Sequence, residues 1–267
     1  MKSSSCVAKL LIALLGITGG TVLSAQVLIT VNDANDTLQW IDPHTLTFTN
    51  IGPLGVAYDF GDLTWNPNTS TLYMIDGRAA RGLYTVNPFT GSTTLIGVHG
   101  ITDLFGLAYN TANDTLYAAS FQTNTLYTLN PATGAATVVG STSVSLGALA
   151  YDSQQGILIG AQDGSGNLYQ VNITTGATTL LASAGYTNDS GLTFDPSQNR
   201  LLDIDWSGNL FSYDIANGYA RTTLLTGLDS HDGLIYIESI PEPGTVSLLL
   251  AGLGLLGFRW FRQRARK

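Results

Sequence analysis

The chain has 267 residues, of which 11% are charged and 44% hydrophobic, and its sequence pI is near 4.5. This hydrophobic content excludes a disordered chain, and the length allows one large domain or two small ones. All Asp and Glu residues lie between Asp33 and Glu242, a stretch that holds only four arginines and no lysine. An acidic body without a basic face excludes nucleic acid as a partner, and we expect none.

Residues 1–25 are typical of a secretory signal peptide. Lys2 and Lys9 precede or flank a short apolar run, and small residues up to Ala25 offer a cleavage site. The single cysteine, Cys6, lies inside this leader, so we expect no disulfide in the mature protein.

Residues 26–240 repeat one unit about every 43 residues. Each unit opens on a glycine and a short apolar strand, continues with two further strands and ends in a corner and a fourth strand. The opening glycines are Gly61, Gly106, Gly147, Gly191 and Gly233. The corners are residues 87–91, 130–134, 172–176 and 214–218, and their last residue is a glycine that supplies the positive φ of a tight turn.

The ends of this body predict a ring. Only one strand, 234–239, fits after Gly233, whereas residues 27–31, 37–41 and 45–51 supply three strands at the front. Together they complete a fifth four-stranded blade, so the repeat predicts an all-β, five-bladed β-propeller of antiparallel blades. A β-sandwich is the alternative, but it explains neither the period nor the split blade. The repeat resembles bacterial surface propellers with Asn-Pro-x-Thr-Gly corners.

The last residues, 241–267, form a separate segment. Pro241, Glu242, Pro243 and Gly244 precede an apolar run, 245–258, and a basic tail that contains Arg259, Arg262 and Arg264. The run predicts a short hydrophobic helix able to enter a bilayer, with the basic tail on the cytoplasmic side. This arrangement resembles the PEP-CTERM sorting signal of Gram-negative bacteria. The resemblance implies cleavage by an exosortase-type protease and display on, or release from, the cell surface, with the helix transiently in the inner membrane. A plain membrane anchor is the alternative.

Ligands of propellers usually bind at the face formed by the loops between blades and between the second and third strands. Acidic residues gather in these loops, among them Asp33, Asp62 and Asp163. As a candidate binding face we select Asp59, Asp103, Asp189, His231, Asp232, Arg78 and Arg81. The alternative is that Asp and Asn beside Gly are only good turn residues.

One segment partly matches a calcium-binding loop, because oxygen side chains alternate before a glycine. Its candidate ligands are Asp203, Asp205, Ser207 and Asp214. The segment also reads as a β-hairpin, and apart from Ca²⁺ here we expect no cofactor.

No motif for catalysis emerges, since no nucleophile elbow, cysteine or His/Cys metal spacing is present in the body. We therefore expect an exported, monomeric, non-catalytic surface or matrix protein that binds glycan or protein partners, with Trp65, Trp206 and Tyr186 as candidate glycan platforms. The alternative is an extracellular polysaccharide hydrolase or lyase that uses aspartates. An enzyme would hold two carboxylates about 5–10 Å apart in one deep pocket, and a buried Asp pair with raised pKa values would favour it.

Overall fold

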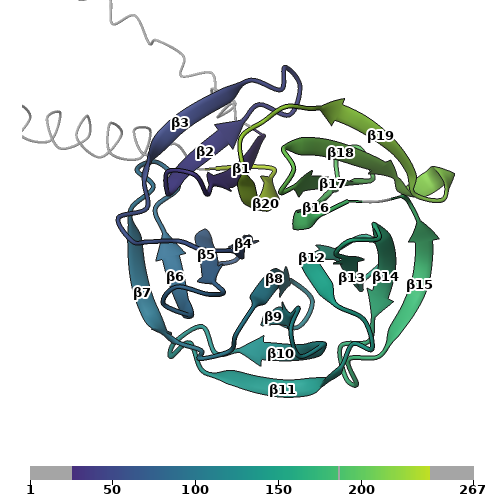
Figure 1. Cartoon of the computed structure of the whole chain (residues 1–267), viewed down its shortest axis with the longest axis horizontal. Coiled ribbons are helices and arrows are strands. Elements are labelled where there is room, and N and C mark those ends of the chain that lie inside the picture. The colour runs from purple at the N-terminus through teal and green to yellow at the C-terminus, as the bar shows by residue number, and fades with distance from the viewer. Residues whose placement is uncertain (1–25, 186, 241–267) are drawn as a thin grey trace, which may run out of the picture.

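A computed structural model of the chain describes residues 26–185 and 187–240. These residues form five four-stranded antiparallel sheets arranged as a ring around a central axis (Figure 1). The prediction of an all-β, five-bladed propeller is therefore confirmed. The predicted signal peptide, sorting segment and C-terminal helix lie outside the described residues. No helix within the described residues is long and apolar enough to cross a membrane.

Each blade runs from an inner strand at the axis to an outer strand at the rim. Blade 1 contains β4 (Gly61–Asn66), β5 (Thr71–Asp76), β6 (Gly82–Val86) and β7 (Thr93–Val98). Blade 2 contains β8 (Leu104–Asn110), β9 (Thr115–Ser120), β10 (Thr125–Leu129) and β11 (Ala136–Ser141). Blade 3 contains β12 (Leu146–Asp152), β13 (Ile157–Gln162), β14 (Asn167–Val171) and β15 (Thr178–Ser183). Blade 4 contains β16 (Asp189–Asp195), β17 (Arg200–Asp205), β18 (Asn209–Asp214), a short 3₁₀ turn η1 (Ile215–Asn217) and β19 (Ala220–Leu225).

Blade 5 joins the two ends of the body. Its inner strand β20 (His231–Ile237) pairs with β1 (Val27–Asn32), which continues to β2 (Thr37–Ile41) and β3 (Phe48–Pro53). Val27 lies opposite Ile237, whereas Asn32 lies opposite His231 at the other end of the ladder. The split blade predicted from the sequence is thus present, and its hydrogen bonds close the ring.

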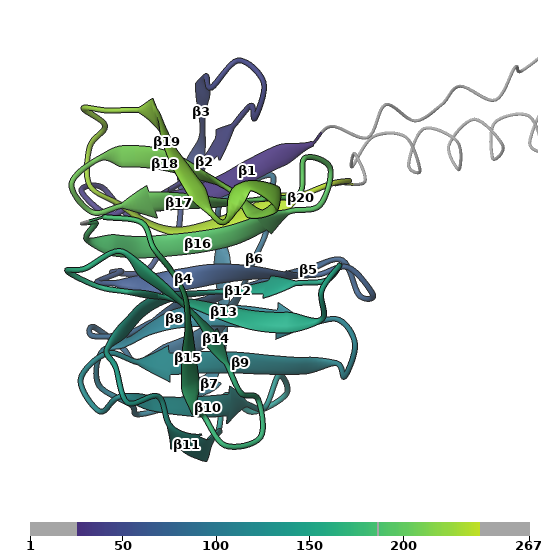
Figure 2. The same ribbon diagram turned by 90° about the vertical axis from the view of Figure 1, so that its right-hand side faces the viewer.

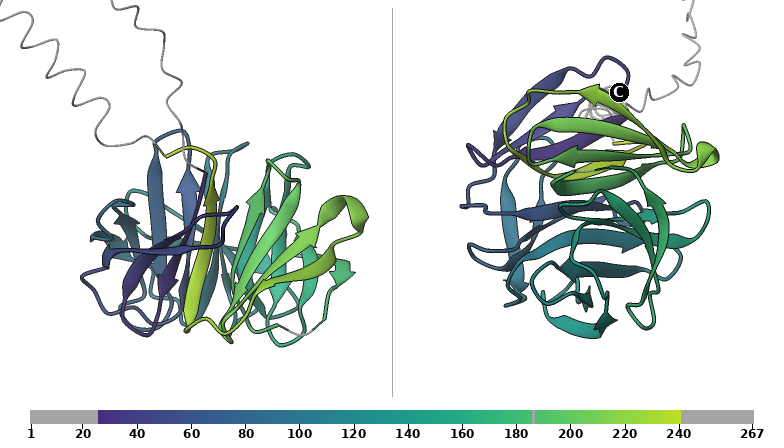
Figure 3. Two further views of the ribbon diagram at one scale, coloured as in Figure 1. Left: turned by 90° about the horizontal axis from the view of Figure 1, so that it is seen from above. Right: turned by 45° about the vertical axis from the view of Figure 1, so that its right-hand side comes forward.

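The positions of the two chain ends distinguish one end of the ring from the other. The described chain begins and ends on the same side, which we call the terminal end (Figures 2 and 3). The opposite side, which we call the far end, holds the turn after Asn32 and the start of β20 at His231. Two kinds of connection lie at the far end: the loops between blades, and the turns between the second and third strands of each blade. They share this end because antiparallel strands alternate in direction.

Burial follows the distance from the axis. The inner strands are almost wholly buried, because neighbouring blades cover both of their faces, whereas the outer strands alternate between half-buried and exposed positions. The apolar core lies between adjacent blades; Ile75 and Leu83 of blade 1, for example, pack with Leu104 and Leu116 of blade 2. Burial of such side chains contributes about 1.5–3 kcal/mol each.

The Asn-Pro-x-Thr-Gly corners fasten neighbouring blades at the rim. In one of them the Asn130 side chain accepts from the Ala132 amide at 2.8 Å, and Gly134 adopts a φ of +73°. The corner packs against Gly97 in the outer strand of the preceding blade, where an added Cβ would lie 2.0 Å from the Thr133 carbonyl oxygen. Gly52 and Gly140 meet the next corners in the same way.

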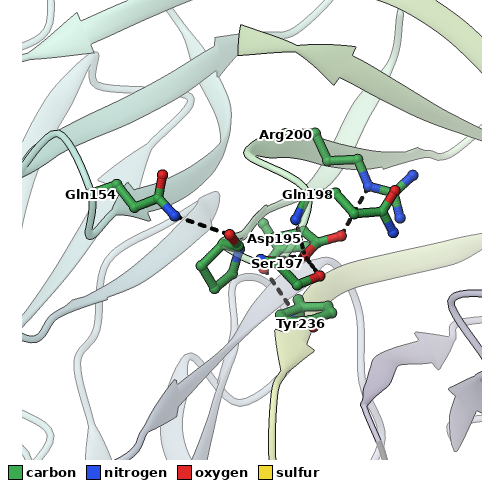
Figure 4. A network of polar contacts seen from close by, with 8 residues as sticks. Gln154, Asp195, Ser197, Gln198, Arg200 and Tyr236 are labelled. Atoms are coloured by element: carbon green, nitrogen blue, oxygen red, sulfur yellow. Dashed lines mark hydrogen bonds and ion pairs between the residues drawn. The ribbon is translucent and has the colours of Figure 1, made fainter. Parts of the chain in front are cut away.

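A polar network ties three blades together at the terminal end (Figure 4). In blade 4, Arg200 forms a 2.9 Å ion pair with the fully buried Asp195, whose carboxylate also accepts from Ser197. Gln154 of blade 3 donates to the Pro196 carbonyl at 2.9 Å. The Tyr236 amide of blade 5 donates to a blade 4 side chain, Thr193 Oγ1, at 2.9 Å. These acidic and amide side chains therefore serve the scaffold.

One carboxylate occupies the axis itself. The sequence placed Asp62 in a loop, but it lies in β4 with no exposed surface. Its oxygens accept from the amides of Leu63 and Leu107 at 2.8 Å each, and the amides of Leu149 and Leu234 also bond to it. Four blades therefore meet at a single side chain.

Candidate functional site

The far end carries different side chains at equivalent positions of the five blades. The residue directly after the second strand of each blade is Asp33, Gly77, Phe121, Asp163 or Trp206. The scaffold needs only a turn residue at this position. Aromatic, acidic and glycine residues occur there instead of one repeated residue type, which departs from the repeat. The departure indicates where a ligand would be recognised.

A cavity of about 270 Å³, the far-end pocket, opens among these positions. Its volume is slightly below the range typical of small-molecule sites, so it suits one small ring or the end of a longer chain. Glycines in the first and third blades leave room for it. Its lining residues are Phe60, Gly61, Arg78, Phe105, Phe121, Gly147, Asp163, Asn188, Trp206 and Asp232.

Four aromatic rings form a continuous row along one wall, in the order Trp206, Phe60, Phe105 and Phe121. Phe60 lies 5.6 Å from Trp206 and 5.2 Å from Phe105, measured between ring centroids, and Phe105 lies 5.6 Å from Phe121. Trp206 is 47% exposed, so the row is open to solvent at that end. Such rings offer π-faces for the apolar face of a sugar or for a cation.

Arg78 is held rigidly against this row. The Asp76 carboxylate caps its turn by accepting from the Arg78 and Ala79 amides at 3.1 and 2.9 Å. Arg78 Nε donates to Asp103 at 2.7 Å, and the guanidinium carbon lies 4.1 Å from the Phe60 ring centroid. The cation is thus already paired and stacked before any ligand arrives.

Asp232 faces the row from the start of β20. Its side chain is 1% exposed, and neither carboxyl oxygen has a hydrogen-bond partner in the described structure. Burial raises the pKa of Asp232 well above its usual value, the charges of Asp33 and Asp59 raise it further, and Arg78 opposes the shift. A buried polar group without a partner costs about 1–3 kcal/mol, so a ligand that satisfied it would gain that energy back.

Asp33 belongs to the same acidic group. Burial raises its pKa, as do the nearby charges of Asp59 and Asp36, while a hydrogen bond from the Trp206 side chain opposes the shift. The far-end pocket therefore has an aromatic wall and an acidic wall, with Arg78 between them.

The structure divides the seven residues of the predicted binding face. Asp232 and Arg78 line the far-end pocket, and Asp59 and Asp103 lie beside them. Arg81 and His231 do not line the far-end pocket. Asp189 begins β16 opposite Asp205, and its side chain lies outside the described residues.

The two remaining candidates, Arg81 and His231, contact residues of their own blades. Arg81 lies beside the buried His99, and its carbonyl accepts from the His99 amide at 2.9 Å. His231 is buried and points outward: its Nδ1 lies 2.7 Å from the Asp229 carbonyl oxygen and its Nε2 2.8 Å from Gln39 Oε1. Burial lowers the pKa of both imidazoles, that of His99 to about 4.

The four predicted calcium ligands do not converge. Asp203 is fully buried and accepts from the Tyr213 hydroxyl at 2.8 Å, whereas Asp205 accepts from Asn209. Asp214 lies at the opposite end of the hairpin, opposite Arg200, where it caps η1. The described residues contain no group of three acidic, His or Cys side chains arranged to hold a metal ion.

A second cavity, of about 340 Å³, opens at the terminal end. Its wall contains the aromatic residues that end the five inner strands, Trp65, Tyr109, Tyr151, Phe194 and Tyr236. Of the predicted glycan platforms, Trp206 therefore lies in the far-end pocket and Trp65 in this second cavity. Tyr186 lies outside the described residues.

Three of the four aromatic rings were missed by sequence reasoning. Phe60 and Phe105 precede or begin inner strands, where an apolar residue is ordinarily core, and Phe121 occupies a turn. The repeat itself offered a signal. Phe121 directly follows the second strand of its blade, as Trp206 does, and a turn does not require an aromatic side chain at that position.

Comparison with known proteins identifies two segments. Residues 14–191 match a family described as "Repeat of unknown function (DUF6923)", and residues 239–264 match the PEP-CTERM protein-sorting motif. The motif implies processing by exosortase and export to the cell envelope of a Gram-negative bacterium. No curated protein matches the chain.

Solved structures share the fold at low sequence identity. A chain of a nidogen/laminin complex is 14% identical with a TM-score of 0.52, and the match covers 81% of this chain and 87% of that one. A protein of unknown function from Bacteroides thetaiotaomicron is 15% identical with a TM-score of 0.56, covering 80% and 71% respectively. These likenesses establish the fold alone.

Proposed function

Because the chain belongs to the DUF6923 repeat family, whose description names no activity, we propose its function from the far-end pocket: it is an exported, non-catalytic surface module that binds an extracellular glycan. Export follows from the PEP-CTERM motif, and the binding role is the inference.

One observation carries the proposal. The far-end pocket combines an exposed aromatic side chain, Trp206, with a buried carboxyl group, Asp232, that has no hydrogen-bond partner among the described residues. Sugars present an apolar ring face and polar hydroxyls together, so they match such a pairing. A purely structural cluster would bury the ring and satisfy the carboxyl.

The position of the far-end pocket supports display. The described chain leaves the ring at the terminal end, where the sorting motif follows Ser239 in the sequence (Figure 3). A protein held to the envelope through that segment would present the opposite end outward. The far-end pocket is therefore the part of the ring most accessible to extracellular polymer.

Glycan-array binding of the full chain, followed by calorimetry with the glycans that bind, tests the proposal. Trp206→Ala should weaken binding about tenfold or more, since an aromatic platform contributes over 1 kcal/mol. Leu180→Ala is the matched control, because Leu180 is a similarly exposed apolar side chain (53%) on an outer strand. No glycan binding, or equal losses in both variants, would reject the proposal.

A polysaccharide hydrolase or lyase is the second candidate, and a specific observation favours it. The far-end pocket holds Asp232, whose raised pKa suits a general acid, and a second carboxyl group, Asp163. The other buried aspartate with a raised pKa, Asp62, is enclosed by backbone amides and does not line the far-end pocket. Release of new reducing or unsaturated ends from a bound glycan, abolished by Asp232→Asn, would establish the enzyme in place of the binding module.

A further inference from the structure

The chemistry of Asp232 narrows the kind of glycan. Its two oxygens are buried and have no hydrogen-bond partner in the described structure, and Asp232 lines the far-end pocket together with the exposed Trp206. Each oxygen exposes less than 1 Å² of surface, so a ligand group that pairs with both must displace the atoms that cover them. The best partner for a buried carboxylate is a cation with several N–H donors, because it offsets the charge and supplies the hydrogen bonds together.

The surroundings of Asp232 favour a positive ligand over a negative one. Asp33 and Asp59 add negative charge on the same side, and Asp163 lines the same cavity. The cation that acts on Asp232, Arg78, is paired with Asp103 at 2.7 Å and stacked on Phe60. A ligand carboxylate or sulfate would thus meet repulsion, whereas a ligand ammonium would relieve it.

The aromatic row supplies the second half of the recognition. The Phe60 ring lies 5.2 Å from Phe105 and 5.6 Å from Trp206 between centroids, and the faces of these rings can hold an apolar ring surface beside a cation. The ligand therefore needs a small ring with an apolar face and an adjacent positive group.

We propose that the far-end pocket binds an amino-sugar residue of an extracellular glycan, with the ring on the Trp206–Phe60–Phe105 row and its protonated primary amine paired with Asp232. This inference rests on the proposed glycan-binding function and specifies its ligand. The ammonium donates two of its three N–H groups to the Asp232 oxygens, which have no other donor in the described structure. An N-acetylated sugar of the same size lacks the charge and cannot form this pair.

The experiment compares two ligands that differ only at the nitrogen. Calorimetry on the full chain uses a glucosamine tetramer and the N-acetylglucosamine tetramer, at a pH where the free amine is protonated. The glucosamine tetramer should bind more tightly, and Asp232→Asn should weaken it about 30-fold or more, because the ammonium then enters a buried site without its partner. Asp214→Asn, an exposed carboxylate on the other side of the ring, should leave affinity unchanged.

Each outcome decides between the two proposals. Tighter binding of the free amine with loss in Asp232→Asn supports the inference. Equal or tighter binding of the N-acetylated tetramer overturns the inference and leaves the glycan-binding function standing. Binding of neither tetramer or of any arrayed glycan overturns both. A thermal unfolding midpoint of Asp232→Asn at or above that of the parent chain excludes misfolding as the cause of a lost affinity.

Discussion

At the scale of single residues, two buried aspartates near the axis should respond in opposite ways to the same substitution. Neither oxygen of Asp232 has a hydrogen-bond partner in the part of the chain that the structure describes. Burial raises the pKa of Asp232, the charges of Asp33 and Asp59 raise it further, and the charge of Arg78 opposes the shift. The folded state therefore holds the Asp232 proton more tightly than the unfolded state does. The stabilisation that comes from holding Asp232 neutral is present at acidic pH. It is lost as the pH rises above the pKa of the unfolded-state carboxyl, about 3.9.

Asp232→Asn should consequently stabilise the fold at neutral pH by about 1 kcal/mol, and the gain should shrink as the pH falls. Urea unfolding of both chains at a series of pH values measures the difference. A loss of stability at neutral pH would mean that the carboxyl group has a structural partner and is not kept free for a ligand.

Asp62 differs because its oxygens accept from backbone amides of Leu63, Leu107, Leu149 and Leu234. Burial raises the pKa of Asp62 as well, although these amides oppose the shift. Asp62→Asn places an N–H₂ donor against amide donors and should destabilise the ring by about 2–3 kcal/mol. Denaturant midpoints at one pH give the comparison with Asp232→Asn. If both substitutions shifted the midpoint in the same direction, this account would be contradicted.

At the scale of strands and turns, close glycine contacts set how tightly one blade packs on the next. A Cβ on Gly97 would lie 2.0 Å from the Thr133 carbonyl oxygen, and both sides of that contact are backbone. Gly97→Ala should therefore cost about 1–3 kcal/mol, since the outer strand must move away from the corner. Val98→Ala in the same strand is the control, because Val98 is 60% exposed and should change stability by less than about 0.5 kcal/mol. Equal midpoints for the two variants would show that the rim is not tightly packed.

The elements also show which parts of the structure the sequence could predict. Strands and corners are local patterns that recur from blade to blade, so each copy supported the others, and the count of strands at the two ends then predicted the split blade. The alignment by opening glycine was wrong for β4 and β12, where Asp62 and Ala148 occupy the place of Gly106 in β8. Gly61 and Gly147 lie one place before the position of Gly106, whether the strand has a register shift, as β12 does, or lacks one, as β4 does.

The candidate site was harder to predict because it forms from single positions in all five blades. Asp232 and Arg78 were selected as loop residues, but their partners Phe60 and Phe105 look like ordinary core in the sequence. These residues are far apart in the sequence and line one cavity only once the ring has closed. Their proximity could therefore not be predicted from the sequence.

At the scale of the whole molecule, the ring has a direction, because the described chain enters and leaves at the terminal end (Figures 2 and 3). The residues of the far-end pocket lie at the opposite end. Attachment to the envelope through the segment that follows Ile240 should therefore hide one face and expose the other. Two small exposed residues report on the two faces: Ala34 lies in the β1–β2 turn at the far end, and Ser153 lines the terminal-end cavity.

Cysteines placed at these two positions should differ in reactivity on cells. The only native cysteine is Cys6, within the predicted leader, so Ala34→Cys and Ser153→Cys each introduce a single thiol to the mature body. A bulky, membrane-impermeant maleimide should label Ala34→Cys several-fold faster than Ser153→Cys on intact cells, because the envelope shields the terminal end. The purified variants should react at similar rates, which removes intrinsic thiol reactivity as the cause. Faster labelling of Ser153→Cys on cells would mean that the terminal end faces outward, and a ligand would then be sought in the aromatic cavity at that end.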